Sequence, residues 1–246
     1  MTLRRFFIKT SLSEEMFIDG QDAHHISKVL RLQVGDKIIV IPPDGQAGTA
    51  QIIEIAVDRV RLLLQGILEE AKEAPIQVYL AQGLPKSDKM DYIIQKAVEL
   101  GVTAIFPIQM DHSVVQYDNA KKKSRGERWQ KISLEAAKQC GRSFVPSVEP
   151  IQSLTELFSQ LSDEVVIIML YEGQTEKGLK KALAEKSAKT YLLLVGPEGG
   201  FSNQELIISQ KHGALVVTMG PRILRTETAS LAAVAMIMYE YGDMGG

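Results

Sequence analysis

The sequence has one cysteine, no long apolar run and no excess of positive charge. The single cysteine, Cys140, excludes an internal disulfide. The longest apolar run, Leu231 to Tyr239, has nine residues, well short of the about 20 that a membrane helix needs. Lysine and arginine total 28 against 30 acidic residues. Any polyanionic partner must therefore meet a local basic patch, because the chain as a whole does not attract one.

Length and composition predict an ordinary globular protein. At about 150 residues per domain, 246 residues make one large domain or two modest ones. Hydrophobic residues make up 45% and charged residues 24%, close to the globular averages, which argues against disorder. The first residues, MTLRRFFIK, carry charges where a signal peptide needs an apolar core. We therefore expect a cytoplasmic location and no association with a membrane.

Residues 1 to about 68 are rich in short β-type runs separated by turn signals. The runs are 6–8, 37–41, 49–55 and 60–64. Residues 25–30 instead place apolar side chains at helical spacing. This pattern predicts a small, mainly antiparallel barrel with one helix. The polar stretch that follows, 69–75, indicates a domain boundary near residue 72.

Residues 72–246 alternate apolar runs with amphipathic segments. The expected strands are 76–81, 104–108, 165–170, 191–195 and 215–218. Strands that read as continuous apolar runs are buried on both faces, as in a parallel sheet covered by helices. Ser153 with Glu156, and Ser202 with Glu205, fit the S-x-x-E capping box that begins a helix. The second domain is therefore predicted to be α/β, with a mostly parallel sheet.

One expected strand runs into a glycine-rich turn, Gly196-Pro197-Glu198-Gly199-Gly200. Ligands of α/β sheets bind just beyond the carboxyl ends of strands, and glycines let a ligand approach the main chain closely. The alternative is that these glycines serve only a tight strand-to-helix turn. The dinucleotide and P-loop fingerprints are both missing, which disfavours a phosphate cradle.

A second such segment follows at 215–229, where a strand leads through Gly220-Pro221 into an apolar helix that ends near Tyr241. Arg225, Thr226 and Glu227 gather polar groups where this helix begins. On a purely structural interpretation, Thr226 caps the helix, Glu227 suits the helix dipole and Arg225 is solvated. If the two strands are neighbours, the two turns form opposite walls of one cleft.

Four motifs together resemble a known family. They are Lys86-Ser87-Asp88-Lys89-Met90-Asp91, Glu99-Leu100-Gly101-Val102, Val195 to Phe201, and Gly220 to Ala229. The chain resembles the SPOUT class of methyltransferases and, more closely, the bacterial family that methylates N3 of a uridine in small-subunit ribosomal RNA. The resemblance implies a PUA-like RNA-binding barrel at residues 1–71. It also implies a methyltransferase domain at 72–246 with a deep trefoil knot, S-adenosylmethionine as cofactor, and a homodimer.

The resemblance assigns the cofactor contacts to three loops that follow strands. Adenine needs apolar walls and a few backbone hydrogen bonds, which these loops offer; Met219 stands where the family usually has leucine. The implied cofactor-binding residues are Leu170, Glu172, Val195, Gly196, Gly199, Gly200, Met219, Gly220, Ile223, Leu224, Thr228 and Ala229.

The implied reaction requires a proton to leave the uridine N3 and negative charge to build up on the flanking carbonyl oxygens. Arg225 is our candidate for stabilising that charge, as donors aimed at a developing oxyanion do. Glu198 and Glu227 are the carboxylates nearest in sequence that could accept the proton. Each of them could instead hold a ribose, an amide or a loop, so the proton acceptor stays open.

The partner implied by the resemblance is small-subunit ribosomal RNA or the assembled small subunit. The expected RNA contacts are Arg4, Arg5, Phe6, Lys28, Arg31, Lys86 and Arg142. Residues 121–142 carry a local formal charge of +6, which is more often a solvated helix face than a binding site. Trp129 within it could stack on a base, but its spacing favours a buried position. The adjacent pair His24-His25 is poorly placed to share a metal ion, so we expect no metal.

Two other functions remain open from the sequence. One is the same methyl transfer to another RNA, such as a tRNA. The other is a non-catalytic RNA-binding or assembly protein that kept the fold. Arg225 and the two glycine turns disfavour the second alternative.

Overall fold

The computed structural model describes residues 3–69, 73–173 and 177–245, and the chain divides into two compact units. Unit 1 comprises residues 1–72 and 138–144, and unit 2 comprises 73–137 and 145–246. The expected boundary between residues 71 and 72 lies outside the described residues. In the described part of the chain no helix is long and apolar enough to cross a membrane.

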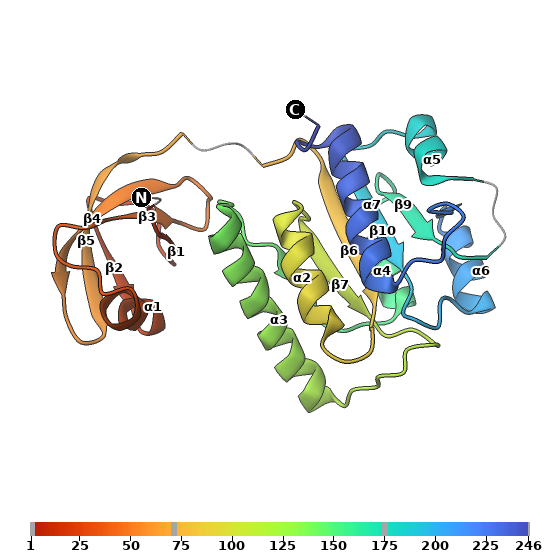
Figure 1. Ribbon diagram of the computed structural model, residues 1–246, viewed down its shortest axis with the longest axis horizontal. Helices are drawn as coiled ribbons and strands as arrows, with labels where there is room; N and C mark the ends of the chain where they lie inside the picture. The colour runs from red at the N-terminus through yellow and green to blue at the C-terminus, as the bar shows by residue number, and fades with distance from the viewer. Residues whose placement is uncertain (1–2, 70–72, 174–176, 246) are drawn as a thin grey trace. The chain divides into compact units, whose positions relative to one another are not determined.

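Unit 1 is built on a five-stranded sheet with the order β1-β3-β4-β5-β2 (Figure 1). The strands are β1 Arg5–Phe7, β2 Glu15–Asp19, β3 Lys37–Ile41, β4 Gly48–Ile55 and β5 Arg59–Ile67. Three pairings are antiparallel and only β1 with β3 is parallel, so the expected mainly antiparallel arrangement is confirmed. The edge strand β2 was not expected. It is joined to β5 by two ion pairs, Asp19 with Arg59 and Glu15 with Arg61.

The expected helix of unit 1 begins as α1, Gln21–His24, and continues as a π-helical turn, η1, His25–Val29. Ile26 is fully buried and anchors this segment on the core formed by one face of the sheet. Phe6 belongs to the same core.

Unit 2 contains a six-stranded sheet in which every pairing is parallel, with the order β11-β9-β10-β6-β7-β8. The strands are β6 Gln77–Gly83, β7 Ala104–Ile108, β8 Ser147–Val148, β9 Val166–Leu170, β10 Thr190–Val195 and β11 Leu215–Val217. All five residues of β9, and the last five of β10, are buried. The expected covered parallel sheet is therefore confirmed, and the two-residue β8 is an addition to it.

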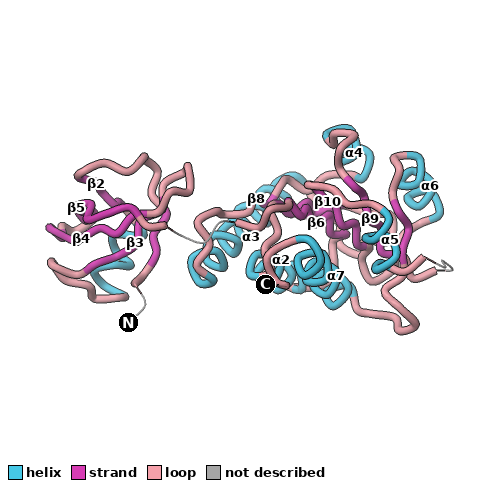
Figure 2. The backbone as a smooth tube through the Cα atoms, turned by 90° about the horizontal axis from the view of Figure 1, so that it is seen from above, coloured by secondary structure: helices cyan, strands magenta, loops and turns pink. Residues whose placement is uncertain are grey.

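Helices cover both faces of this sheet (Figures 1 and 2). They are α2 Lys89–Glu99, α3 Asn119–Cys140, α4 Leu154–Gln160, α5 Leu179–Glu185, α6 Asn203–Lys211 and α7 Thr226–Tyr241. In both views α2 and α7 pack side by side on one face, while α4 and α6 lie on the other. The apolar side chains of α4 and α6 join one core cluster with β9 and β10.

The first residues of α4, α6 and α7 show whether the predicted helix caps form. Both capping boxes are present: the hydroxyls of Ser153 and Ser202 each accept a hydrogen bond from the main-chain amide of the glutamate three residues on. The structural alternative in which Thr226 caps α7 is wrong. The N-cap position is Arg225, whose side chain makes no capping bond, and the Thr226 hydroxyl is turned to Gly196.

The sheet order corrects one topological expectation. The strands before the two glycine turns, β10 and β11, are not neighbours, because β9 lies between them. A parallel sheet places all three carboxyl ends at one edge. The loops after β9, β10 and β11 therefore meet there. The trefoil knot implied by the family resemblance stays a prediction.

Candidate functional site

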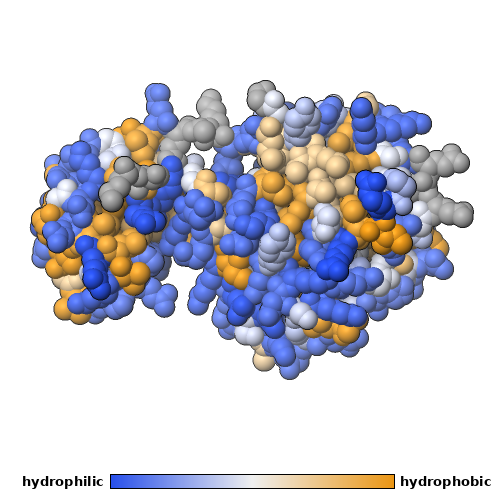
Figure 3. Space-filling view, viewed as in Figure 1, coloured by the Kyte–Doolittle hydropathy of each residue, from blue (hydrophilic) through white to orange (hydrophobic). Residues whose placement is uncertain are grey.

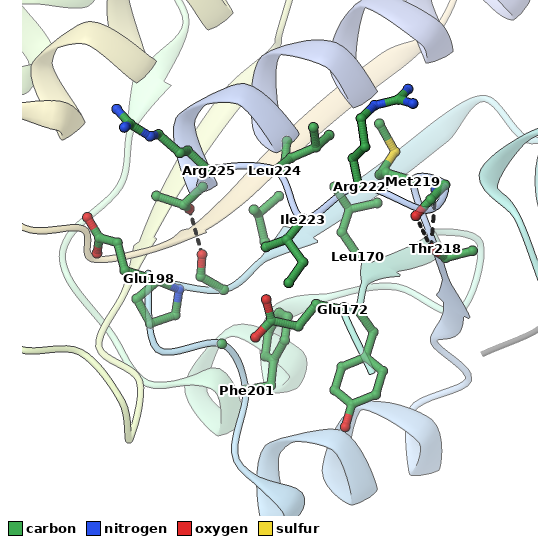
Figure 4. A pocket seen from close by; sticks show the side chains of 18 of the residues that line it. Leu170, Glu172, Glu198, Phe201, Thr218, Met219, Arg222, Ile223, Leu224 and Arg225 are labelled. Atoms are coloured by element: carbon green, nitrogen blue, oxygen red, sulfur yellow. Dashed lines mark hydrogen bonds between the residues drawn. The ribbon is translucent and has the colours of Figure 1, made fainter. Parts of the chain in front are cut away.

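A cavity of about 420 Å³ lies at the carboxyl edge of the parallel sheet (Figure 4). Its walls are the ends of β9 and β10, the loops after β9, β10 and β11, and the first turn of α7. This volume lies within the range of small-molecule and cofactor sites, about 300–1,000 Å³.

Most of the expected site residues come together at this cavity. Its lining includes the expected residues Leu170, Glu172, Val195, Gly196, Glu198, Gly200, Met219, Gly220, Ile223, Leu224, Arg225 and Ala229. Three expected residues are not part of the lining. Gly199 packs against His112, Thr228 is exposed on α7, and Glu227 reaches the site through an ion pair with the lining residue Lys89.

One part of the lining is apolar. Leu170 and Val195 are buried strand ends, and Met219 and Leu224 are half-buried. Ile223 is 83% exposed, and Figure 4 shows its side chain directed into the cavity toward Glu172. An exposed isoleucine in a concave site offers apolar surface to a ligand.

The glycine turn after β10 is shaped for a close approach. Gly200 has a φ of 67°, in the left-handed region that favours glycine. A Cβ atom there would lie 2.7 Å from Oε1 of Glu172. His112 also contacts the turn: its Nδ1 lies 2.9 Å from the main-chain oxygen of Gly199. Glycine at position 200 therefore lets the Glu172 carboxylate lie directly over the turn.

A buried polar network joins the sheet to the glycine turn and to α7. The Thr226 hydroxyl donates to the main-chain oxygen of Gly196 at 2.6 Å and accepts from Nε2 of Gln82 at 2.9 Å. Ser230 donates to Oε1 of the same glutamine. Gln82, Thr226 and Ser230 are all buried. Buried polar groups that are fully hydrogen-bonded rigidify their surroundings, so this network fixes Gly196 at the cavity wall.

A second polar cluster includes two residues of the cavity lining, Lys89 and Glu198. Nζ of Lys89 lies 2.9 Å from Oε1 of Glu198 and 3.1 Å from Oε2 of Glu227. The main-chain amide of Lys86 donates to the Glu198 carboxylate at 3.2 Å. We call Lys89, Glu198 and Glu227 the lysine–carboxylate cluster.

Charge pairing affects the pKa values of Lys89 and Glu198. Partial burial favours neutral Glu198, but the hydrogen bonds from Lys89 and from main-chain amides outweigh it and hold the pKa of Glu198 below its ordinary value. The hydrogen bond to Glu198, with a further one to Glu227, raises the pKa of Lys89 despite desolvation. The pair is therefore ionised at neutral pH.

The two arginines of the lining point outward. Figure 4 shows the side chains of Arg222 and Arg225 extending away from the cavity centre, and both residues are exposed. Arg225 thus lies where the wall of the cavity meets solvent, at the first residue before α7.

Several lining residues were not among the expected ones. They are Lys89, Tyr171, Pro197, Phe201, Thr218, Pro221, Arg222 and Thr226. Most of these neighbour an expected residue in the three loops. Lys89 is different, because it comes from α2, where the first family motif is its only sequence signal.

The expected RNA contacts lie in both units. In unit 1, Arg4, Lys28 and Arg31 are exposed, whereas Arg5 and Arg142 are half-buried. Phe6 is only 3% exposed and packs edge-on against His25, so its ring offers no stacking surface. In unit 2, Lys86 is exposed.

Trp129 is buried, as its spacing predicted. It is 2% exposed, and its indole N–H donates to Oδ1 of Asp91 at 3.0 Å. Across the residues that the structure describes, no group of three or more histidine, cysteine or acidic side chains is arranged to hold a metal ion.

Comparisons with known proteins agree with this architecture. A family model described as an RNA methyltransferase domain matches residues 72–238, and one described as an RNA methyltransferase PUA domain matches 18–64. The chain is 36% identical to the ribosomal RNA small subunit methyltransferase E of Bacillus subtilis over 97% of both chains. It is 30% identical to that of Mycobacterium tuberculosis, over 89% of this chain and 84% of the relative.

A solved structure shows the same fold. The ribosomal RNA small subunit methyltransferase E of Neisseria gonorrhoeae, bound to S-adenosyl methionine, superposes with a TM-score of 0.89 at 32% identity, covering 98% of this chain and 99% of that one. The chain therefore belongs to the RNA methyltransferase family that includes the ribosomal RNA small subunit methyltransferases E.

Proposed function

We propose that this protein transfers a methyl group from S-adenosylmethionine to N3 of a uridine in small-subunit ribosomal RNA. The observation that carries the proposal is the cavity at the ends of β9, β10 and β11, which gathers most of the residues expected to bind the cofactor. It is supported by a relative of the same fold that was solved with S-adenosyl methionine bound and by relatives named for small-subunit ribosomal RNA.

The residues of the cavity suit this cofactor. Leu170, Val195 and Leu224 give apolar walls for a flat heterocycle. The carboxylates of Glu172 and Glu198 lie in the lining, and a nearby negative charge favours a cation. When bound, the cofactor supplies a methyl group on a positively charged sulfur.

This chain's own residues orient the acceptor and stabilise its charge. Methyl transfer needs in-line approach, so positioning supplies much of the catalysis. Arg225, at the junction of the cavity wall and solvent, meets the base that enters from outside. Its guanidinium donates hydrogen bonds to the uracil carbonyl oxygens as the N3 proton leaves. Glu198 accepts from the Lys86 amide and from Lys89, which weakens it as a base.

RNA binding is assigned to exposed cations. We assign phosphate contacts in unit 1 to Arg4, Lys28 and Arg31, with Arg5 and Arg142 as half-buried supports. In unit 2, the exposed Lys86 lies next to the lysine–carboxylate cluster, because its main-chain amide donates to Glu198. Proteins that modify a single base recognise the surrounding RNA by shape and phosphates and unstack the target.

A homodimer is the proposed state in solution, and the cytoplasm, where ribosomal subunits are present, is the proposed location. The outer face of α7 exposes Met236 and Tyr239 by 49% and 67%, and Tyr92 of the adjacent α2 is 51% exposed. Figure 3 shows a hydrophobic patch over this region of unit 2. Sedimentation of M236E/Y239E should give a monomer where the natural chain gives a dimer; an unchanged sedimentation coefficient would place the dimer contact elsewhere.

The function is tested by methyl transfer with an undermethylated small subunit. Purified protein, S-adenosylmethionine and small subunits are incubated, and the nucleosides are separated by mass spectrometry. The proposal predicts 3-methyluridine, dependent on enzyme and cofactor. A methylated nucleoside made only in tRNA would reassign the substrate. Absence of cofactor binding in calorimetry would favour the non-catalytic alternative.

A further inference from the structure

The lysine–carboxylate cluster joins three elements that are far apart in the sequence. Lys89 is the first residue of α2, Glu198 belongs to the loop after β10, and Glu227 is in the first turn of α7. One ammonium group lies within about 3 Å of both carboxylates. Among the described residues, the ion pairs of Glu198 and Glu227 are both with this lysine.

The cluster is sheltered and carries unequal charge. The side chains of Lys89, Glu198 and Glu227 are 32%, 25% and 17% exposed. One positive charge balances two negative ones, so the cluster is formally −1. Oε2 of Glu227 is buried and has no hydrogen-bond partner in the described chain besides its ion contact with Lys89. Removing the ammonium would leave two neighbouring carboxylates in a sheltered site, which is strongly unfavourable.

The loops that the cluster connects are the walls of the cavity. Glu198 sits in the glycine turn between Gly196 and Gly200, and Glu227 follows Arg225 and Thr226. Glu198 also fixes the turn before α2 through the Lys86 amide, where Ser87 adopts a left-handed φ of 57°. A strained residue of this kind persists only where the surroundings hold it.

We propose that Lys89 is a positioning residue of the cavity, whose ammonium pairs with Glu198 and Glu227 at once and thereby fixes the loop after β10 against the first turn of α7. The proposal rests on the proposed function, since the loops it positions are those assigned to the cofactor and to Arg225. Lys89 itself is not assigned a proton-transfer role, because its pairing keeps it charged.

The test compares K89Q, K89R and the double variant K89Q/E227Q with the natural chain. Calorimetry should show about tenfold weaker S-adenosylmethionine binding for K89Q, because coupled ion networks contribute on that scale. K89R should restore most of the affinity, since it keeps the charge. The double variant should bind more tightly than K89Q, because one of the two neighbouring carboxylates left without a counter-ion has been replaced by a neutral amide. The control K96Q breaks a Lys–Glu pair on the same helix, Lys96 with Glu99, and should bind as the natural chain does.

Two pH-dependent readouts separate this role from a general structural one. The depressed pKa of Glu198 contributes stability that is present above its ordinary value of 4.5 and is lost as the pH falls through the folded-state pKa. In the absence of cofactor, the difference in Tm between the natural chain and K89Q should therefore shrink from pH 6 to pH 4. Without Lys89 the pKa of Glu198 should rise, because the hydrogen bond that lowers it is lost. The acidic limb of the pH profile of kcat/KM should therefore move to higher pH in K89Q and return to its original position in K89R.

Failure of the inference and failure of the proposed function give different results. If the natural chain neither binds S-adenosylmethionine nor methylates small subunits, the proposed function fails. If the natural chain does both, but K89Q binds equally well or K89R and K89Q/E227Q are as impaired as K89Q at every pH, then only the role of Lys89 is overturned.

Discussion

Removing the Thr226 hydroxyl tests whether its hydrogen bonds stabilise unit 2 and hold the wall of the cavity. In T226V, a side chain of nearly the same shape loses the hydrogen bond to the Gly196 oxygen and the one from Gln82. Thr226 is 6% exposed and Gln82 is fully buried, so water cannot replace either partner. A buried polar group left unsatisfied costs about 1–3 kcal/mol. Gln82 Nε2 keeps one bond, to the Gly83 oxygen, so we expect T226V to destabilise unit 2 by about 2–4 kcal/mol.

The assay is denaturant unfolding followed by fluorescence of Trp129. This is the single tryptophan of the chain, it is 2% exposed, and it belongs to unit 2. T226S is the matched control, because it keeps the hydroxyl and loses only one methyl group, at a cost of about 0.8 kcal/mol. If T226V unfolds within about 0.5 kcal/mol of the natural chain, the network does not hold the turn and the reasoning is refuted.

Three further predictions concern ligand contacts. G200A should abolish detectable S-adenosylmethionine binding in calorimetry, because alanine is strained at a φ of 67° and its Cβ would lie 2.7 Å from the Glu172 carboxylate; unchanged affinity would remove this turn from the site. R225Q should lower kcat about 10²–10³-fold with cofactor affinity unchanged, as loss of an oxyanion donor does; equal losses in kcat and in cofactor binding would make Arg225 a binding residue. K121Q/K131Q removes two exposed cations of α3. If the charged run of α3 is only a solvated face, the slope of log affinity against log salt for small-subunit RNA stays unchanged, whereas phosphate contacts would lower it by about 1 per lysine.

Local patterns predicted the elements of this fold well. The strands β9 and β10 are continuous apolar runs and lie in a sheet covered on both faces. The capping boxes at Ser153 and Ser202 formed as expected, because a cap depends on residues three positions apart. The short strands β2 and β8 were missed. They are five and two residues long, and pairing with neighbouring strands, which a local pattern does not encode, stabilises them.

Contacts between residues far apart in the sequence could not be predicted from local patterns. The family resemblance identified the three loops of the cavity, but the position of β9 between β10 and β11 depends on the order of strands in the whole sheet. Gln82 finds Thr226 across 144 positions, and this contact, rather than a helix cap, sets the role of that threonine. Lys89 belongs to the first family motif, but no local pattern pairs it with Glu198 and Glu227, which only the fold brings within about 3 Å of its ammonium group.

A crystal structure of this chain with S-adenosylmethionine tests the central claim most directly. The account predicts electron density for the cofactor between the loops after β9, β10 and β11, in contact with Leu170, Gly196 and Leu224, and with Ile223 covered by it. Density at any other place on the chain, or a cavity that remains empty at saturating cofactor while binding is measured in solution, would contradict it.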